Sequence, residues 1–147
     1  MTEVIKKYEL KKVELDSTFD AVHIKSSQDS YNFIKQFYES DIDIYESFFI
    51  LMLDRKNVTI GFAKISQGGV AGTYIDTKLV AKYAVESLCN GIILAHNHPS
   101  GNIQPSNDDM EITKKIQLMF SYHDIKVFDH IIITKNSYYS FIDNNLL

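Results

Sequence analysis

With 147 residues, the chain is expected to form one domain around a single hydrophobic core. Its longest apolar run, FFILML, is far too short to cross a bilayer, and its amino-terminal stretch lacks the apolar segment of a secretion signal. A net charge of −4 and a single arginine argue against a nucleic-acid binder, which normally carries a basic stripe. The one cysteine, Cys89, allows no internal disulfide, so we expect a cytoplasmic protein with no membrane anchor.

Three elements are predicted in the first half of the chain. Residues 28–39 place apolar side chains at helical spacing after a Ser/Asp start, which predicts an amphipathic helix. Residues 46–54, ESFFILMLD, are apolar on both alternating faces, which indicates a strand that is covered on both sides. RKN then predicts a turn, and VTIGFAKIS (58–66) predicts a second strand that pairs with the first as a hairpin.

The second half of the chain alternates helices with strands. The glycine-rich QGGVAGTY (67–74) matches no phosphate-binding pattern and is interpreted as a turn with a bulge, and Asp76 is expected to cap the helix that follows it. The later predicted elements are a strand at 91–97, a helix at about 107–121, a strand at 126–133, a turn, and a last strand at 138–142. The predicted fold class is therefore α/β, with residues 1–147 as a single domain in which helices flank a central mixed sheet.

The segment AHNHPSGNIQPSNDD (95–109) carries the residues most suited to chemistry. Residues i and i+2 of a strand point to the same face, roughly 6.5 Å apart along the backbone. His96 and His98 can therefore aim two imidazoles at one point, while Asn97 faces the other way. Neutral imidazole is a good zinc ligand, but a pair of histidines needs a third ligand.

Asp109 is the candidate for that third ligand. It lies on the same face of the predicted helix as the apolar positions Ile112 and Ile116, whereas Asp108 lies about 100° away around the helix axis. Ser106 and Asp109 also approximate a capping box, which is compatible with a metal-binding role for Asp109. Proline and glycine residues between the histidines and Ser106 explain how the chain could bend back from the strand to the helix.

Two histidines and one aspartate leave a fourth tetrahedral position open. Catalytic zinc sites hold water there, and a nearby carboxylate then acts as the general base. The chemistry alone allows any of the seven glutamates to be that base. Glu46 is the best placed, because it opens the apolar strand and shares a face with Phe48 and Ile50.

Together these residues resemble a known signature. His96-x-His98, seven residues, Ser106, two residues and Asp109, with Glu46 upstream, are similar to the JAMM (MPN-type) zinc metalloprotease motif. The longer sequence pattern AHNHPSG…PS..D resembles that of the RadC family of bacterial JAMM-domain proteins. The likeness also includes FFILMLDRKN, GGVAGTYIDTKLVAKYA, DHIII and YYSF, and so covers roughly residues 45–147.

The resemblance implies a mixed sheet flanked by helices, in a cytidine-deaminase-like arrangement. It implies Zn²⁺ as cofactor with His96, His98 and Asp109 as ligands, Glu46 as the base, and Ser106 as a hydrogen-bond donor to the tetrahedral intermediate. The implied reaction is hydrolysis of a peptide or isopeptide bond in a protein or peptide substrate. The helix-hairpin-helix-like region of long RadC members is expected to be absent, since only about 45 residues precede Glu46.

Two other functions remain as alternatives. A role in DNA repair or recombination, acting through nucleic-acid or partner binding, rests on the family's name and is opposed by the acidic composition. A zinc nucleobase deaminase would need H-x-E and P-C-x-x-C motifs, which a chain with one cysteine does not contain. His130, in FDHIII, is interpreted as a structural partner of the adjacent Asp129 rather than as a metal ligand.

Overall fold

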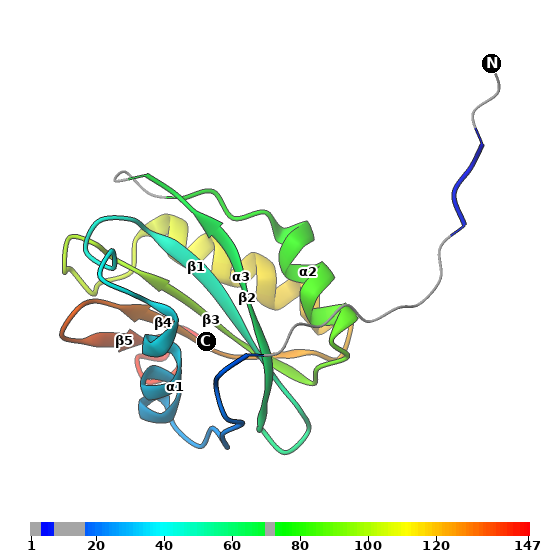
Figure 1. Cartoon of the computed structure of the whole chain (residues 1–147), viewed down its shortest axis with the longest axis horizontal. Helices are drawn as coiled ribbons and strands as arrows, with labels where there is room; N and C mark the ends of the chain where they lie inside the picture. Colours follow the sequence, from blue (N-terminus) through cyan, green and yellow to red (C-terminus); the bar gives the residue numbers. More distant parts are fainter. Residues whose placement is uncertain (1–3, 8–16, 70–72) are drawn as a thin grey trace.

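The computed structural model describes residues 4–7, 17–69 and 73–147 of the chain. One mixed sheet of five strands, in the order β2-β1-β3-β4-β5, forms the centre of this described part (Figure 1). Its strands are β1 (Ser47–Leu53), β2 (Thr59–Gln67), β3 (Gly91–Asn97), β4 (Lys126–Ile133) and β5 (Tyr138–Ser140). Only β3 and β4 are parallel; the other neighbouring strands pair antiparallel. The predicted α/β class with a mixed sheet is confirmed.

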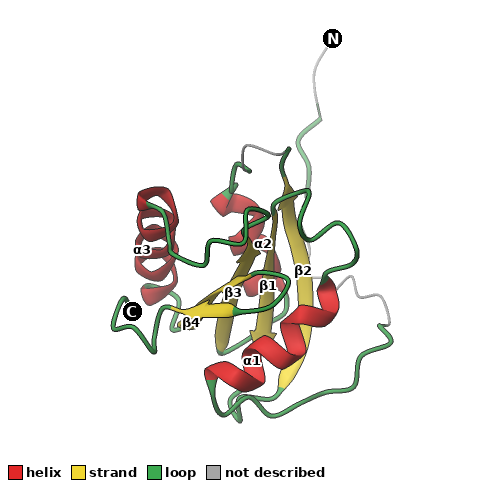
Figure 2. Cartoon of the chain, turned by 90° about the vertical axis from the view of Figure 1, so that its left-hand side faces the viewer, coloured by secondary structure: helices red, strands yellow, loops and turns green. Residues whose placement is uncertain are grey.

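Helices cover both faces of the sheet. They are α1 (Ser27–Ile34), which a short 3-10 turn (Lys35–Phe37) extends, α2 (Thr77–Glu86) and α3 (Asn107–Ser121). Helices α2 and α3 pack on one face and α1 packs on the other (Figure 2). Among the described residues, no helix has both the length and the apolar character needed to cross a bilayer.

Successive side chains of β1 and β3 point to opposite faces of the sheet, and both faces are covered, which explains why both strands are apolar throughout. Every residue of either strand is buried. Phe48 and Ile50 of β1 belong to the core beneath α2 and α3, whereas Leu51 and Leu53 belong to the core beneath α1. A strand that lies between two helical layers needs apolar side chains on both sides, as the sequence predicted.

Most predicted boundaries agree with the structure. The elements β3, α3 and β4 match the predicted ranges, and Asp76 caps α2 by accepting a hydrogen bond from the backbone N–H of Lys78. The helix predicted at 28–39 ends earlier, at Ile34, because the chain tightens there into the 3-10 turn, and β5 is shorter than predicted. Part of the turn predicted at 67–74 lies outside the described residues.

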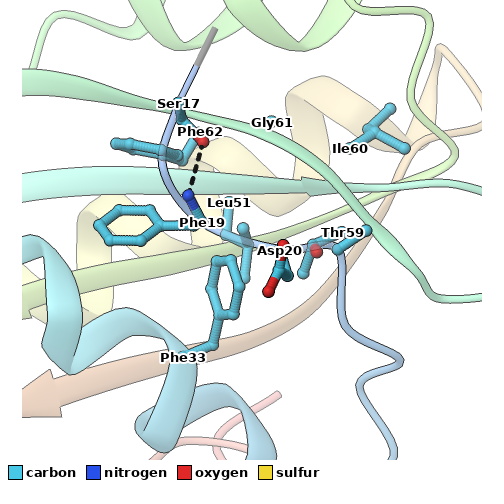
Figure 3. Close-up of a pocket in the computed structure, with 10 residues that line it drawn as sticks. Ser17, Phe19, Asp20, Phe33, Leu51, Thr59, Ile60, Gly61 and Phe62 are labelled. Carbon is cyan, nitrogen blue, oxygen red and sulfur yellow. Dashed lines mark hydrogen bonds between the residues drawn. The ribbon is translucent and has the colours of Figure 1, made fainter.

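A pocket of about 130 Å³ lies on the α1 side of the sheet, between the segment that precedes α1 and the hairpin of β1 and β2. Phe19, Phe33, Leu51 and Phe62 form its apolar lining (Figure 3). Phe19 also packs its ring against those of Phe33 and Phe62. The pocket contains none of the candidate site residues and belongs to the packing of this core.

Candidate metal centre

Three elements bring the candidate residues together at one edge of the sheet. His96 lies at the carboxyl end of β3, and His98 follows that strand directly. The amino end of β1 lies alongside, because β1 runs antiparallel to β3 and pairs Phe48 with His96. Glu46, two residues before Phe48, therefore reaches the histidines. Asp109 comes from the first turn of α3, which packs on that same face of the sheet.

The nitrogen and oxygen atoms of the two histidines and Asp109 converge. The Nε2 atoms of His96 and His98 are 3.0 Å apart. Asp109 places Oδ1 3.2 Å from Nε2 of His96 and Oδ2 3.2 Å from Nε2 of His98. Ligands of a tetrahedral zinc, with bonds of about 2.0–2.1 Å, lie about 3.3 Å from one another. The spacing and the chemistry of these three side chains therefore fit a zinc ion.

Glu46 lies slightly farther away. Its Oε1 is 3.9 Å from Nε2 of His96 and 4.0 Å from Nε2 of His98. Glu46, His96 and His98 form a group that could hold a metal ion, with donor atoms all within 4.8 Å of one another. The oxygens of Asp109 are closer to Nε2 of both histidines than Oε1 of Glu46 is.

Asp109 is held in place by the amino end of its own helix. The hydroxyl of Ser106 accepts a hydrogen bond from the backbone N–H of Asp109, and the backbone N–H of Ser106 donates to Oδ2 of Asp109 over 2.8 Å. This is the capping box that the sequence predicted. The side chain of Asp108 is exposed and takes no part in the site.

The charges of the site stabilise one another in the metal-free protein. Burial raises the pKa of Asp109, but hydrogen bonds with His96 and His98 outweigh it and hold that pKa far below its usual value. Burial lowers the pKa of His98, whereas the Asp109 carboxylate and the carbonyl of Asn102 raise it, and the net shift is upward. The Asp109 carboxylate therefore stays ionised, and its negative charge attracts positive charge to the site.

His98 is oriented by its own loop. Its Nδ1 lies 2.6 Å from the carbonyl oxygen of Asn102. A carbonyl oxygen only accepts, so Nδ1 carries a proton and donates it. Nε2 donates to Asp109 when the ring is protonated, and it is the nitrogen that is left free for a metal when the ring is neutral.

Asn97 acts from the other face of the strand. Its Oδ1 accepts a hydrogen bond from the backbone N–H of Ser47 over 2.7 Å, and its Nδ2 donates to the carbonyls of Ile42 (2.6 Å) and Tyr45 (2.7 Å). These partners lie on both sides of Glu46 in the sequence, so Asn97 fixes the backbone that carries Glu46. The alternation of the strand predicted only that this side chain faces away from the histidines. An asparagine inside an apolar strand was the signal for its further role.

His130 does contact the Asp129 side chain, as the sequence predicted, but through its backbone N–H and not through its ring. Asp129 accepts from the backbone N–H of His130, from that of Ile142 and from the hydroxyl of Ser140. The ring of His130 instead lies 2.7 Å from Nδ1 of His96. A bulge in β4 is the cause: Ile92 pairs with Val127 and Ile93 with Asp129, so Phe128 is an extra residue that shifts the alternation.

The sequence model of the RadC-like JAB domain family matches residues 24–146. The chain belongs to the RadC-like JAB domain family. A UPF0758 protein of Flavobacterium johnsoniae is 46% identical over 102 residues, which are 69% of this chain and 44% of that protein. One of Porphyromonas gingivalis is 38% identical over 103 residues (69% and 45%), and one of Coprothermobacter proteolyticus is 31% identical over 134 residues (90% and 57%).

The chain thus spans about half the length of the curated relatives that it matches. The matched family range includes all five candidate residues, and a small domain with a five-stranded mixed sheet and three helices is consistent with a JAB/MPN-like fold. The resemblance to RadC that the motifs indicated is confirmed for residues 24–146.

Proposed function

We propose that this RadC-like JAB domain is a zinc-dependent metallopeptidase or isopeptidase of the JAMM type. The observation that carries the proposal is the convergence of His96, His98 and Asp109, whose donor atoms lie 3.0–3.2 Å apart, with a glutamate oxygen 3.9–4.0 Å from both histidines. His96, His98 and Asp109 would hold the ion. Zinc bound there would lower the pKa of a water in the fourth position and polarise the carbonyl to be cleaved.

The residues around the ion supply the rest of the chemistry. Glu46 takes a proton from the attacking water as the new C–O bond forms, and it returns a proton to the leaving amine as the C–N bond breaks. Ser106 accepts a hydrogen bond from Asp109 and still carries its own hydroxyl proton, which it can donate to the developing oxyanion. The partner that this reaction requires is a protein or peptide substrate.

Replacement of Glu46 by glutamine tests the proposal. We expect Glu46→Gln to keep its zinc, because no ligand is lost, and to cleave substrate roughly 10²–10⁴-fold more slowly, which is the usual contribution of general acid–base catalysis. Asp109→Asn should lose both zinc and activity. Glu111→Gln is a matched control, since Glu111 is exposed on α3.

The substrate screen is a peptide library together with isopeptide-linked lysine peptides, analysed by mass spectrometry and compared between zinc-loaded and metal-free protein. The expected result is cleavage by the loaded protein alone. Zinc-loaded wild-type protein that cleaves none of these substrates, or a Glu46→Gln protein as active as wild type, would overturn the proposal.

A further inference from the structure

Behind His96 lies a chain of buried hydrogen bonds that the reaction above does not use. Nδ1 of His96 is 2.7 Å from Nε2 of His130, and Nδ1 of His130 is 2.6 Å from Oγ1 of Thr113. Oγ1 of Thr113 is in turn 2.6 Å from the backbone carbonyl oxygen of Asp109. The chain thus begins at one proposed ligand and ends on the backbone of another.

The donor and the acceptor of every hydrogen bond in this series follow from its last group, the backbone carbonyl of Asp109. The carbonyl oxygen of Asp109 can only accept, so the hydroxyl of Thr113 donates to it. The oxygen of Thr113 must then accept from Nδ1 of His130. A neutral imidazole carries one N–H, so Nε2 of His130 is an acceptor, and Nδ1 of His96 must be the donor. The proton of a neutral His96 is therefore on Nδ1, and the lone pair of Nε2 points at the metal centre.

The surroundings of His130 favour the hydrogen-bond direction from His96 through His130 to Thr113. Its side chain is fully buried, stacks on Phe141 at a ring-centroid distance of 4.6 Å, and has Phe48 edge-on at 5.6 Å. Burial disfavours the charged form of an imidazole, so this site favours a neutral ring with one N–H. An apolar side chain at this position could not hydrogen-bond to His96 or to Thr113.

We propose that His130 is a positioning residue of the metal centre, which together with Thr113 holds His96 in the tautomer whose Nε2 is free of a proton and aimed at the ion. The inference rests on the proposed zinc site, but it does not depend on peptidase activity. His98 is oriented separately by the carbonyl of Asn102, and Asp109 by the backbone of Ser106, so His130 completes the set of supports around the three proposed ligands.

Three variants test the proposal. His130→Leu removes the acceptor for His96, whereas the amide oxygen of His130→Gln can replace Nε2 as that acceptor. Thr113→Val keeps the shape of the side chain but removes the group that sets the direction of the chain. His123→Gln is the control, because His123 is exposed in the turn that follows α3.

The first measurement is the tautomer of His96 in the metal-free wild-type protein, from long-range ¹H–¹⁵N NMR spectra of the imidazole nitrogens at pH 8. We expect a protonated Nδ1 and an unprotonated Nε2. In Thr113→Val we expect signals of both tautomers. A wild-type His96 protonated on Nε2 would overturn the proposal. Because it needs no metal, this measurement tests the chain of hydrogen bonds even if the zinc site itself fails.

The second measurement is the Kd for zinc, from competition with a chromogenic chelator. Loss of a partner behind a metal-bound histidine typically weakens metal binding about 10–100-fold, so we expect that loss in His130→Leu and a Kd within a few-fold of wild type in His130→Gln and His123→Gln. A folded His130→Leu protein with wild-type zinc affinity would refute the role of His130. If His130→Leu does not fold, equal zinc affinity of Thr113→Val and wild type, with an unchanged His96 tautomer, would refute it. A wild-type protein that binds no zinc would instead overturn the proposed function.

Discussion

Asn97 is predicted to hold the amino end of β1, and with it Glu46, against the end of β3. Asn97 is fully buried, and it makes three hydrogen bonds to backbone groups between Ile42 and Ser47. Asn97→Ala removes all three, and a net loss of about 1 kcal/mol for each gives about 3 kcal/mol. Because Ser47 is itself buried, its unpaired N–H makes this a lower bound. A loss of that size is a large fraction of the roughly 5–15 kcal/mol that stabilises a typical domain.

The measurement is urea unfolding of the metal-free protein at pH 7, followed by circular dichroism, with a thermal scan beside it. A loss of about 3 kcal/mol should lower Tm by roughly 6–12 °C in a domain of this size. Asn32→Ala is the control: Asn32 is exposed on α1 and is bonded to the side chain of Gln28, so its loss should change stability by less than about 0.5 kcal/mol. If Asn97→Ala is as stable as this control, Asn97 does not hold the segment.

Asn97→Asp gives the same prediction a pH signature. The aspartate keeps the acceptor for Ser47 but places a second carboxylate oxygen against the carbonyls of Ile42 and Tyr45, which are 2.6 and 2.7 Å from Nδ2 of Asn97. Only a protonated carboxyl can donate there, so folding raises the pKa of the new group. Its contribution to stability is then present below the unfolded pKa of about 3.9 and is lost as the pH rises through the folded pKa. The free energy of unfolding of Asn97→Asp should therefore approach that of wild type as the pH falls. A difference between the two proteins that does not change with pH would contradict the hydrogen-bond directions given above.

Four further predictions concern the metal, acid and nucleic acid. Purified protein should hold about one zinc per chain, lost in His98→Ala and kept in Asp108→Asn; full zinc in His98→Ala would contradict the ligand set. Zinc affinity should fall toward about pH 5, where free imidazole is protonated, and a flat titration would exclude histidine ligands. Burial keeps the pKa of His130 low, so the unfolded state takes up a proton below about pH 6.5 that the folded state does not. Metal-free wild type should thus lose stability as the pH falls from 7 to 5, and His130→Gln should not show this loss. Filter binding to DNA should show no steep dependence on salt, since the chain carries a net charge of −4.

The parts of the site that the sequence predicted depend on residues close together in the chain. The alternation of a strand places His96 and His98 on one face, and the helical period distinguishes Asp109 from Asp108. The capping box lies within four residues, from Ser106 to Asp109. Each of these follows from local geometry, and the structure has each as predicted.

The parts that the sequence missed depend on register between distant segments. His130 meets His96 only because β4 is parallel to β3 and contains a bulge before Asp129. Nothing near His130 in the sequence indicates a bulge, since FDHIII contains no glycine or proline. Thr113 was more accessible to prediction: it lies one helical turn after Asp109, on the face that the apolar positions assign to the core.

The asparagine between the two histidines has a purpose that a zinc site alone does not explain. Ligand spacing requires only that some residue separate His96 from His98, because alternation does the rest. With asparagine there, the opposite face of the same strand end fixes the backbone on both sides of Glu46. Two proposed ligands and the support of the proposed base then belong to three consecutive residues, of which the first two end β3 and the third follows it directly. A displacement of that strand end would move the proposed ligands and the proposed base together, which preserves the separation of 3.9–4.0 Å between Glu46 and the histidines that the proposed proton transfer needs.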